Sequence, residues 1–392
     1  MWFHFHFANY FRMLRLAWAE PNAGVRGYYL AKLLFWIPPV SAFHAVCFFL
    51  DGILFPGLHR IEIREPVFVI GHARSGTTLV HRLMSNDGDR FGSFRLYEMF
   101  FPSLLQKKAI RALARFDAAV LGGSIEKRLR KWEETHYEAS RAAHPTGLTE
   151  PEEDDQVLYY SCASGFWITK MPYMGDLDFY YVDRWPEAER KRLMRFYADC
   201  IKRQLYLNGS NRIHLSKNPV FPGRTQTLID TFPDARFVVP MRNPYETIPS
   251  LLSLVQSGWK RLGWPPERQE RCLKILADQS FDTYLYPLEV FERNPETRVS
   301  IVDYRDVVAD PAAAIEGVYR DLEIPVSAAY RERLLAEGKR ARKHKSSHRY
   351  SLERFGLEPD AIRAGLSELF DRYQWDAEDD VDAPSSEDTD GQ

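Results

Sequence analysis

Short apolar runs rich in Val and Ile alternate along the chain with stretches of helical periodicity. Residues 67–70 (VFVI), 235–240 and 299–302 form such runs, and residues 212–215 are a weaker candidate. A short β-branched run that ends on glycine or proline is typical of a strand buried on both faces of a parallel sheet. These runs are therefore predicted to be the strands of one sheet.

Between these runs, apolar residues recur about every 3.6 positions, as on one face of a helix. The pattern predicts helices over residues 189–207, 247–257, 267–291 and 311–322. Strands that alternate with helices predict an α/β fold whose parallel sheet is flanked by helices. Residues 93–183 do not alternate in this way and are predicted to be an insertion.

The first 60 residues are apolar and aromatic. Residues 33–50 carry no charged residue, but Pro38-Pro39 in the middle is predicted to break a helix there. A straight membrane-spanning helix needs about 20 apolar residues, and this stretch falls short. Residues 2–18 mix Phe, Trp and Tyr with arginine, a combination that favours the membrane interface. Three alternatives stay open: interfacial docking, a helical layer or lid on the domain, and a spanning helix.

The charge of the chain is unevenly distributed. Residues 376–392 contain eight acidic residues and no Lys or Arg, which predicts a disordered acidic tail. Subtracting these eight charges from the net charge of −2 leaves +6 for the rest of the chain. A mildly basic body suits a small polyanionic ligand, whereas a nucleic-acid-binding protein usually has clustered basic stripes and a high pI. No nucleic-acid partner is therefore expected.

The cysteines bear mainly on the cellular compartment. Cys47, Cys162, Cys200 and Cys272 are widely separated, without a CxxC pair, so neither a zinc site nor a disulfide framework is indicated. Free cysteines are typical of a reducing compartment. We expect a cytoplasmic protein, peripheral on the membrane if the N-terminal segment docks there.

The most informative motif follows the first predicted strand. Residues 71–78 (GHARSGTT) form a glycine-bounded loop between a strand and a helix, an arrangement that points backbone N–H groups at a phosphate. The P-loop of nucleoside triphosphatases has the same glycine spacing, followed by lysine. Here Thr77 replaces that lysine, and the cation is Arg74 inside the loop. Such a loop is poorly suited to Mg-ATP and better suited to a phosphate ester that needs no metal.

A second motif follows the strand predicted at residues 235–240. Arg242-Asn243-Pro244 stands at the strand end, and Ser250 comes eight residues after the arginine. An arginine there offers a bidentate cation for a phosphate. Taken in order, the two motifs resemble those of sulfotransferases that use 3′-phosphoadenosine 5′-phosphosulfate (PAPS). The branch with an Arg-Ser-Gly-Thr-Thr loop, shared by tyrosylprotein sulfotransferases and many bacterial enzymes, is the most similar.

The resemblance, which covers residues 66–373, implies a set of donor-binding residues. Arg242 and Ser250 would bind the 3′-phosphate, and Tyr304 would contact the adenine, although Arg305 stands where the family usually has glutamate. Lys345 lies in the basic segment 339–348, which resembles the late basic loop that closes over the nucleotide. Tyr304 could instead be an aromatic residue of the core, and the basic segment could instead be a solvated run of charges. The 5′-phosphosulfate would be bound by Arg74, Ser75, Gly76, Thr77 and Thr78.

The resemblance also implies catalytic roles. Lys217, after a short predicted strand, would neutralise charge on the bridging oxygen of the donor, assisted by Arg74. Glu98 matches the glutamate that serves as the base in tyrosylprotein-type enzymes, at a somewhat longer offset from the loop. His72 is the rival base. The acidic residues at 150–155 are predicted to begin a helix rather than to contact the acceptor.

These expectations combine into one reading of the chain. Residues 61–375 would be a sulfotransferase domain with a P-loop-like fold, preceded by an aromatic helical layer at residues 1–60. Residues 93–183 would shape the acceptor side. The enzyme would use PAPS, release PAP and need no metal. Its acceptor would be a small molecule or lipid, a hydrophobic alcohol above all. A small-molecule kinase and a non-catalytic, membrane-associated nucleotide-binding protein are the alternatives.

Overall fold

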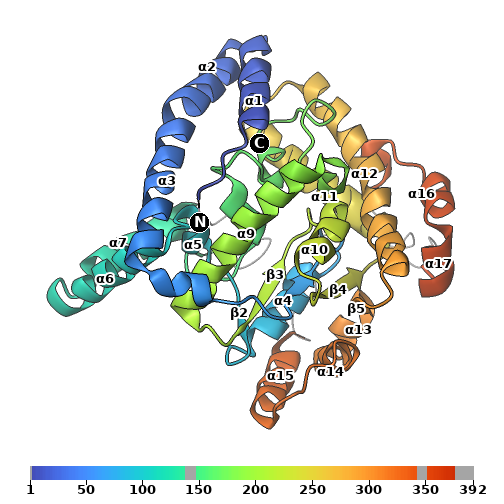
Figure 1. Ribbon diagram of the computed structural model, residues 1–392. Helices are drawn as coiled ribbons and strands as arrows, with labels where there is room; N and C mark the ends of the chain where they lie inside the picture. Colours follow the sequence, from blue (N-terminus) through green and yellow to red (C-terminus); the bar gives the residue numbers. More distant parts are fainter. Residues whose placement is uncertain (1, 137–146, 342–350, 376–392) are drawn as a thin grey trace.

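A five-stranded parallel sheet forms the centre of the protein. The computed structural model describes residues 2–136, 147–341 and 351–375 (Figure 1). The sheet has the strand order β2-β3-β1-β4-β5, and every neighbouring pair is parallel. The predicted α/β class is therefore confirmed. The strands are β1 (Val67–Val69), β2 (Phe91–Gly92), β3 (Ile213–Lys217), β4 (Arg236–Met241) and β5 (Arg298–Asp303).

The four predicted strands are all present, with ends within two residues of the prediction. Strand β2 was not predicted, because two residues are too few to show a pattern. The central strand β1 is buried at every position. Its side chains alternate between the two faces: Val67 and Val69 join one apolar cluster, and Phe68 joins the other. Helices consequently cover both faces of the sheet.

One face packs against α4, α14 and α15, and the other against the longer helices α9 and α12. The four predicted helices are confirmed as α9, α11, α12 and α14, each with bounds close to the prediction. Helix α4 starts directly after the glycine-bounded loop, and α11 starts after the Arg-Asn motif. The helices that surround the sheet are α4 (Thr77–Ser85), α9 (Glu187–Asn208), α10 (Thr225–Thr231), α11 (Pro244–Arg261), α12 (Pro266–Arg293), α13 (Tyr304–Ala309), α14 (Pro311–Asp321), α15 (Ala328–Ala341), α16 (Pro359–Gly365) and α17 (Ser367–Tyr373).

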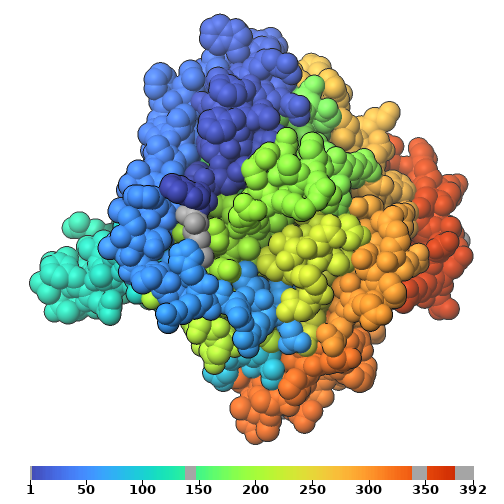
Figure 2. All heavy atoms as spheres, in the orientation of Figure 1, coloured from blue at the N-terminus to red at the C-terminus, as the bar shows by residue number. Residues whose placement is uncertain are grey.

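The N-terminal residues form a helical layer, coloured blue in Figures 1 and 2. The predicted break at Pro38-Pro39 is wrong, because helix continues from Ala23 to Leu54. The prolines lie in the first turn of α3, directly after a π-helical turn, η1. A proline is tolerated in a first turn, and a π-turn changes the register of the hydrogen bonds before it. The elements are α1 (Phe7–Ala19), α2 (Ala23–Ala31), η1 (Lys32–Trp36), α3 (Ile37–Leu54) and the 3-10 helix η2 (Pro56–Arg60).

Helix Ala23–Leu54 has a mean hydropathy of 1.9 over its most apolar window, and 33% of that window is buried within the protein. By length and composition it could cross a membrane. It is also tied to the rest of the fold, because Asp51 on α3 pairs with Arg203 on α9 at 2.7 Å, both side chains wholly buried. The layer is therefore packed on the domain along one side and exposed along the other.

The segment between β2 and α9 contains helices and, in its described part, no strand. Its two longest helices form a hairpin, α6–α7, that projects from the body (Figure 1). No residue of α7 is buried. After the hairpin, the segment returns to the sheet, where Asp154 lies against the carboxyl end of β3. Its elements are α5 (Leu96–Phe100), α6 (Leu104–Val120), α7 (Ser124–His136) and the 3-10 helices η3 (Asp154–Leu158), η4 (Gly165–Trp167) and η5 (Val182–Arg184).

Candidate active site

The loop between β1 and α4 has the backbone geometry of an anion cradle. Gly71 and Gly76 have φ angles of 140° and 96°, and Arg74 has a φ of 73°. A non-glycine residue in this region is uncommon and is often found at functional sites. A Cβ atom on Gly76 would lie 2.5 Å from the ring of Tyr304, so only glycine fits there. The hydroxyl of Ser75 is buried without a hydrogen-bond partner among the described residues, as expected of a group that binds a phosphate oxygen.

The second motif lies against this loop. Arg74 Nε donates a hydrogen bond to Ser250 Oγ at 3.1 Å, and Arg242 Nη1 donates to the carbonyl oxygen of Arg74 at 3.3 Å. The guanidinium of Arg242 stacks over Tyr304, 4.3 Å from the ring centroid, and its Nε is 2.9 Å from a carboxylate oxygen of Glu246. The structure thus brings together three parts of the chain that are far apart in the sequence: Arg74, residues 242–250 and Tyr304.

Lys217 ends β3, next to β1 in the sheet, and only 1% of its side chain is exposed. Its Nζ lies 3.5 Å from Thr78 Oγ1 in the first turn of α4. The same nitrogen lies 3.1 Å from Glu153 Oε1 and 3.9 Å from Glu152 Oε2. The catalytic lysine expected from the sequence is therefore beside the loop and pairs with a carboxylate that was not expected there.

The acidic segment does begin a helix, the 3-10 helix η3, with Glu153 as its N-cap residue. Asp154 is buried and accepts hydrogen bonds from Ser216 Oγ at 2.9 Å and Asn218 Nδ2 at 3.2 Å, the two neighbours of Lys217. Asp155 pairs with Arg224 at 3.3 Å. The helix start was predicted, but the role of the segment in holding the lysine strand was missed. Nothing in the one-dimensional pattern specifies these partners.

Glu98 is wholly buried in a different polar network. Its Oε2 accepts from the Arg95 backbone N–H at 3.1 Å and completes a capping box on α5. Its Oε1 accepts from Arg111 Nη2 at 3.3 Å and from Asn208 Nδ2 at 3.2 Å. Among the described residues, no recorded hydrogen bond or ion pair joins Glu98 to Lys217 or to the loop. Its assignment as the base stays a prediction.

His72, the rival base, is buried in the loop and stacked on Tyr284, with ring centroids 5.1 Å apart. Its Nε2 lies 2.9 Å from Ser280 Oγ, and its Nδ1 lies 2.6 Å from the carbonyl oxygen of Ala73. Burial lowers the pKa of His72 to about 4. The imidazole is therefore neutral near pH 7, and both ring nitrogens already face partners within the protein. Lys345 lies outside the described residues.

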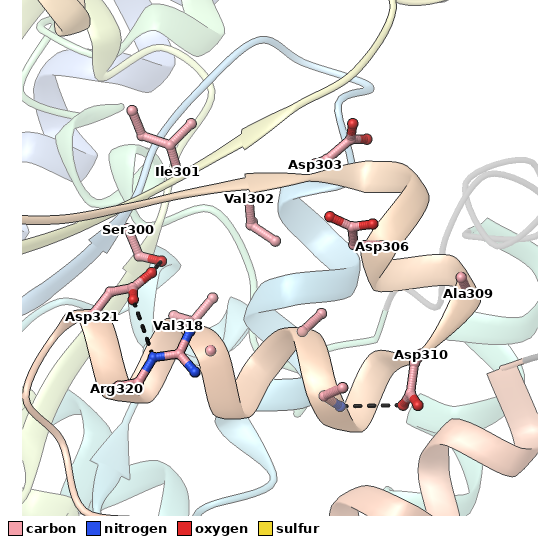
Figure 3. A pocket seen from close by; sticks show the side chains of 13 residues that line it. Ser300, Ile301, Val302, Asp303, Asp306, Ala309, Asp310, Val318, Arg320 and Asp321 are labelled. Atoms are coloured by element: carbon pink, nitrogen blue, oxygen red, sulfur yellow. Dashed lines mark hydrogen bonds and ion pairs between the residues drawn. The ribbon is translucent and has the colours of Figure 1, made fainter. Parts of the chain in front are cut away.

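A pocket of about 390 Å³ lies beside β5, between this strand and α13–α14 (Figure 3). Asp321 accepts a hydrogen bond from Ser300 at 2.7 Å, and Asp310 caps α14 through the Ala313 N–H. Several carboxylates line the pocket, so it would repel an anionic nucleotide. The wall is formed by Ser300, Ile301, Val302, Asp303, Asp306, Ala309, Asp310, Ala313, Ala314, Gly317, Val318, Arg320 and Asp321.

Comparison with known proteins agrees with this geometry. The profile of the Sulfotransferase family matches residues 66–328. The chain belongs to the sulfotransferase family. Membership confirms the resemblance noted in the sequence and implies PAPS as the sulfuryl donor. Within the described residues of this sulfotransferase, no group of three or more His, Cys, Asp or Glu side chains could hold a metal ion.

Several proteins similar to this sulfotransferase come from mycobacteria. The omega-hydroxy-beta-dihydromenaquinone-9 sulfotransferases Stf3 of Mycobacterium bovis and Mycobacterium tuberculosis are each 25% identical over 340 residues, 79% of this chain and 75% of the relative. Sulfotransferase STF9 from Mycobacterium avium has a TM-score of 0.67 at 18% identity, with 93% of this chain and 96% of that chain covered. STF1 from Mycobacterium tuberculosis H37Rv has a TM-score of 0.62 at 21% identity, with 93% and 92% covered. The structural likeness shows the shared fold.

Proposed function

We propose that this sulfotransferase transfers the sulfuryl group of PAPS to the hydroxyl of a lipid-like alcohol at the membrane surface. The observation that carries the donor half is the loop at residues 71–78. Its backbone forms a cradle, its buried Ser75 hydroxyl has no hydrogen-bond partner within the part of the chain that the structure describes, and Lys217 lies beside it. Arg74, Ser75, Gly76, Thr77 and Thr78 would hold the 5′-phosphosulfate.

The other end of the donor fits the second motif. Arg242 and Ser250 would hold the 3′-phosphate, and the ring of Tyr304, against which Arg242 packs, would lie beside the adenine. Since Arg74 bonds to Ser250, the two proposed phosphate sites would be adjacent. Lys217 would donate to the bridging oxygen, where negative charge develops as the S–O bond breaks. A kinase reading is not favoured, because Thr77 stands where a nucleoside triphosphatase has its lysine.

The acceptor half rests on the exposed side of the N-terminal layer. Phe43, Phe49 and Ile53 lie along α3 and are 55%, 48% and 60% exposed. Exposed apolar patches of this kind mark interaction surfaces. The relative Stf3 is named for a hydroxylated menaquinone, which is a lipid. The large apolar side chains exposed in this layer are Trp2, Phe7, Phe11, Trp18, Tyr28, Leu34, Phe35, Trp36, Phe43, Val46, Phe49, Ile53 and Leu54.

The donor assignment is tested by thermal shift with PAP and with Mg-ATP. PAP should stabilise the protein and Mg-ATP should not, whereas stabilisation by Mg-ATP alone would contradict the proposal. The acceptor is sought by mass spectrometry of lipid and polar extracts from cells with and without the protein. A sulfate mass difference confined to polar metabolites would contradict the lipid-like acceptor and leave the sulfotransferase assignment intact.

Membrane contact is tested on the full chain, because deleting the N-terminal layer would remove Asp51 from its buried pair with Arg203. Replacing Phe43, Phe49 and Ile53 by Ser should abolish co-sedimentation with vesicles of phosphatidylglycerol and phosphatidylcholine. The matched control replaces Leu254 and Leu335, exposed apolar residues outside the layer, and should sediment like the wild type. Wild-type protein that ignores vesicles would contradict membrane docking.

A further inference from the structure

The proposed reaction needs a group that accepts the proton of the acceptor hydroxyl. Of the two carboxylates near the predicted catalytic lysine, that of Glu153 is closer and that of Glu152 is farther away. Glu153 Oε1 is 3.1 Å from Lys217 Nζ, and 22% of the Glu153 side chain is exposed, against 1% for Lys217. Glu153 therefore links the buried lysine to the protein surface.

The position of Glu153 is fixed by its neighbours in the chain. The N–H of Glu152 donates to the carbonyl of Phe94 at 3.2 Å, which ties the segment to the connection between β2 and α5. On the other side, Asp154 is anchored to Ser216 and Asn218, the residues that flank the lysine. The residues on both sides of Glu153 are thus held by hydrogen bonds, on one side to Phe94 and on the other to the two neighbours of Lys217. A carboxylate held in this way is pre-organised, as a catalytic group must be.

We infer that Glu153 is the base that accepts the proton from the acceptor hydroxyl. In this step the acceptor oxygen forms a bond to sulfur as the S–O bond to the phosphate breaks. The proton of the hydroxyl passes to the Glu153 carboxylate, and the electron pair of the broken bond stays on the bridging oxygen of PAP beside Lys217. The products are the sulfate ester, PAP and a protonated Glu153, which later releases its proton to water. This inference rests on the proposed sulfuryl transfer and adds a residue to it.

The inference differs from the resemblance-based expectation of Glu98. Glu98 is wholly buried, and both of its oxygens accept hydrogen bonds, one of them in the capping box on α5. An acceptor hydroxyl could reach this carboxylate only after those bonds are broken. Glu153 is partly exposed, and its recorded ion pair is to the lysine of the site itself.

The test compares Glu153→Gln with Glu98→Gln and with Glu150→Gln, an exposed glutamate of the same segment that serves as the matched control. Glutamine keeps an oxygen that can accept a hydrogen bond from Lys217 but removes the base. Transfer of ³⁵S from labelled PAPS to a total bacterial lipid extract in detergent micelles measures turnover, and calorimetry measures PAP binding. Loss of a general base lowers turnover by about 10²- to 10⁴-fold.

We expect Glu153→Gln to lose at least about 100-fold in turnover, to bind PAP no more weakly than wild type, and to lose the acid limb of the pH–rate profile. Glu150→Gln should match wild type. A Glu153→Gln variant that retains turnover, or one whose only defect is weaker PAP binding, would overturn the inference. Inactivity of Glu98→Gln beside an active Glu153→Gln would return the role to Glu98. A failure of the proposed function would appear in the wild type, as absence of PAP binding and of ³⁵S transfer.

Discussion

Arg242 offers a sharp test of how the donor is held, because it contacts the loop, an aromatic ring and a competing carboxylate at once. Replacing Arg242 by Ala removes the cation expected to bind the 3′-phosphate. A charge-assisted hydrogen bond contributes about 1.5–3 kcal/mol. In the free protein, however, Arg242 pairs with Glu246, and the two side chains are 25% and 40% exposed. A pair this exposed contributes only about 0.2–1 kcal/mol, and this contribution is lost when the phosphate replaces the Glu246 carboxylate.

The net loss on Arg242→Ala is therefore about 0.5–2.8 kcal/mol, or about 2- to 110-fold in affinity. It should appear in the affinity for PAP and not in the affinity for 5′-AMP, which lacks the 3′-phosphate. Isothermal calorimetry with both nucleotides gives the ratio. The 5′-AMP measurement also controls for the loop, because Arg242 donates to the carbonyl of Arg74 and its loss could disturb the cradle.

Glu246→Gln provides the opposite perturbation. Removing the competing carboxylate should leave Arg242 available to the phosphate and strengthen PAP binding by up to about fivefold. A PAP to 5′-AMP ratio unchanged in Arg242→Ala would refute the assignment of this motif to the 3′-phosphate. A weaker affinity for PAP in Glu246→Gln would show that the carboxylate positions Arg242 rather than competing for it.

Three further substitutions probe the fold and the loop. Gly76→Ala would place a methyl group 2.5 Å from an aromatic ring at a φ of 96°, so it should abolish PAP binding in calorimetry, whereas Gly88→Ala, with its nearest atom at 3.9 Å, should not. Asp51→Ala removes a carboxylate from a wholly buried ion pair and should destabilise the protein by about 3–5 kcal/mol in urea unfolding. Asp230→Ala, in an exposed pair, should cost less than about 1 kcal/mol. Burial lowers the pKa of His81 to about 3, so the unfolded chain binds the proton first, and stability should fall as pH drops below about 6.5. His81→Gln should flatten this pH dependence of the melting temperature.

The sheet could be predicted from the sequence because its signals are local. Residues 67–70 are apolar and mostly β-branched, and glycine ends the run. The strand and the loop after it can therefore be predicted from residues that are adjacent in the sequence. The donor motifs were also visible, since Arg74 and Arg242 each follow a predicted strand. In a parallel sheet the strand ends meet at one edge, which explains why the two motifs contact each other.

What the sequence did not reveal depends on partners distant in the chain. The acidic segment reads as a helix start, yet Asp154 is buried against the end of β3 and Glu153 reaches Lys217. A charged residue can be buried where its partners are supplied by tertiary structure. Likewise, Pro38-Pro39 signals a helix break, and only the π-turn before it allows the helix to continue. Neither outcome has a local signature.

The π-turn η1 limits which insertions and deletions the N-terminal layer can tolerate. Attachments of the long helix lie on both sides of this turn: the Tyr29 hydroxyl bonds to the carbonyl of Lys170, and Asp51 pairs with Arg203. A π-turn accommodates one residue more than the α-helix around it, so it sets the rotational phase between these two attachments. A one-residue insertion or deletion here would turn one attachment away from its partner. Related chains that keep both attachments should therefore differ in length at residues 32–36 only together with a compensating change between Tyr29 and Asp51.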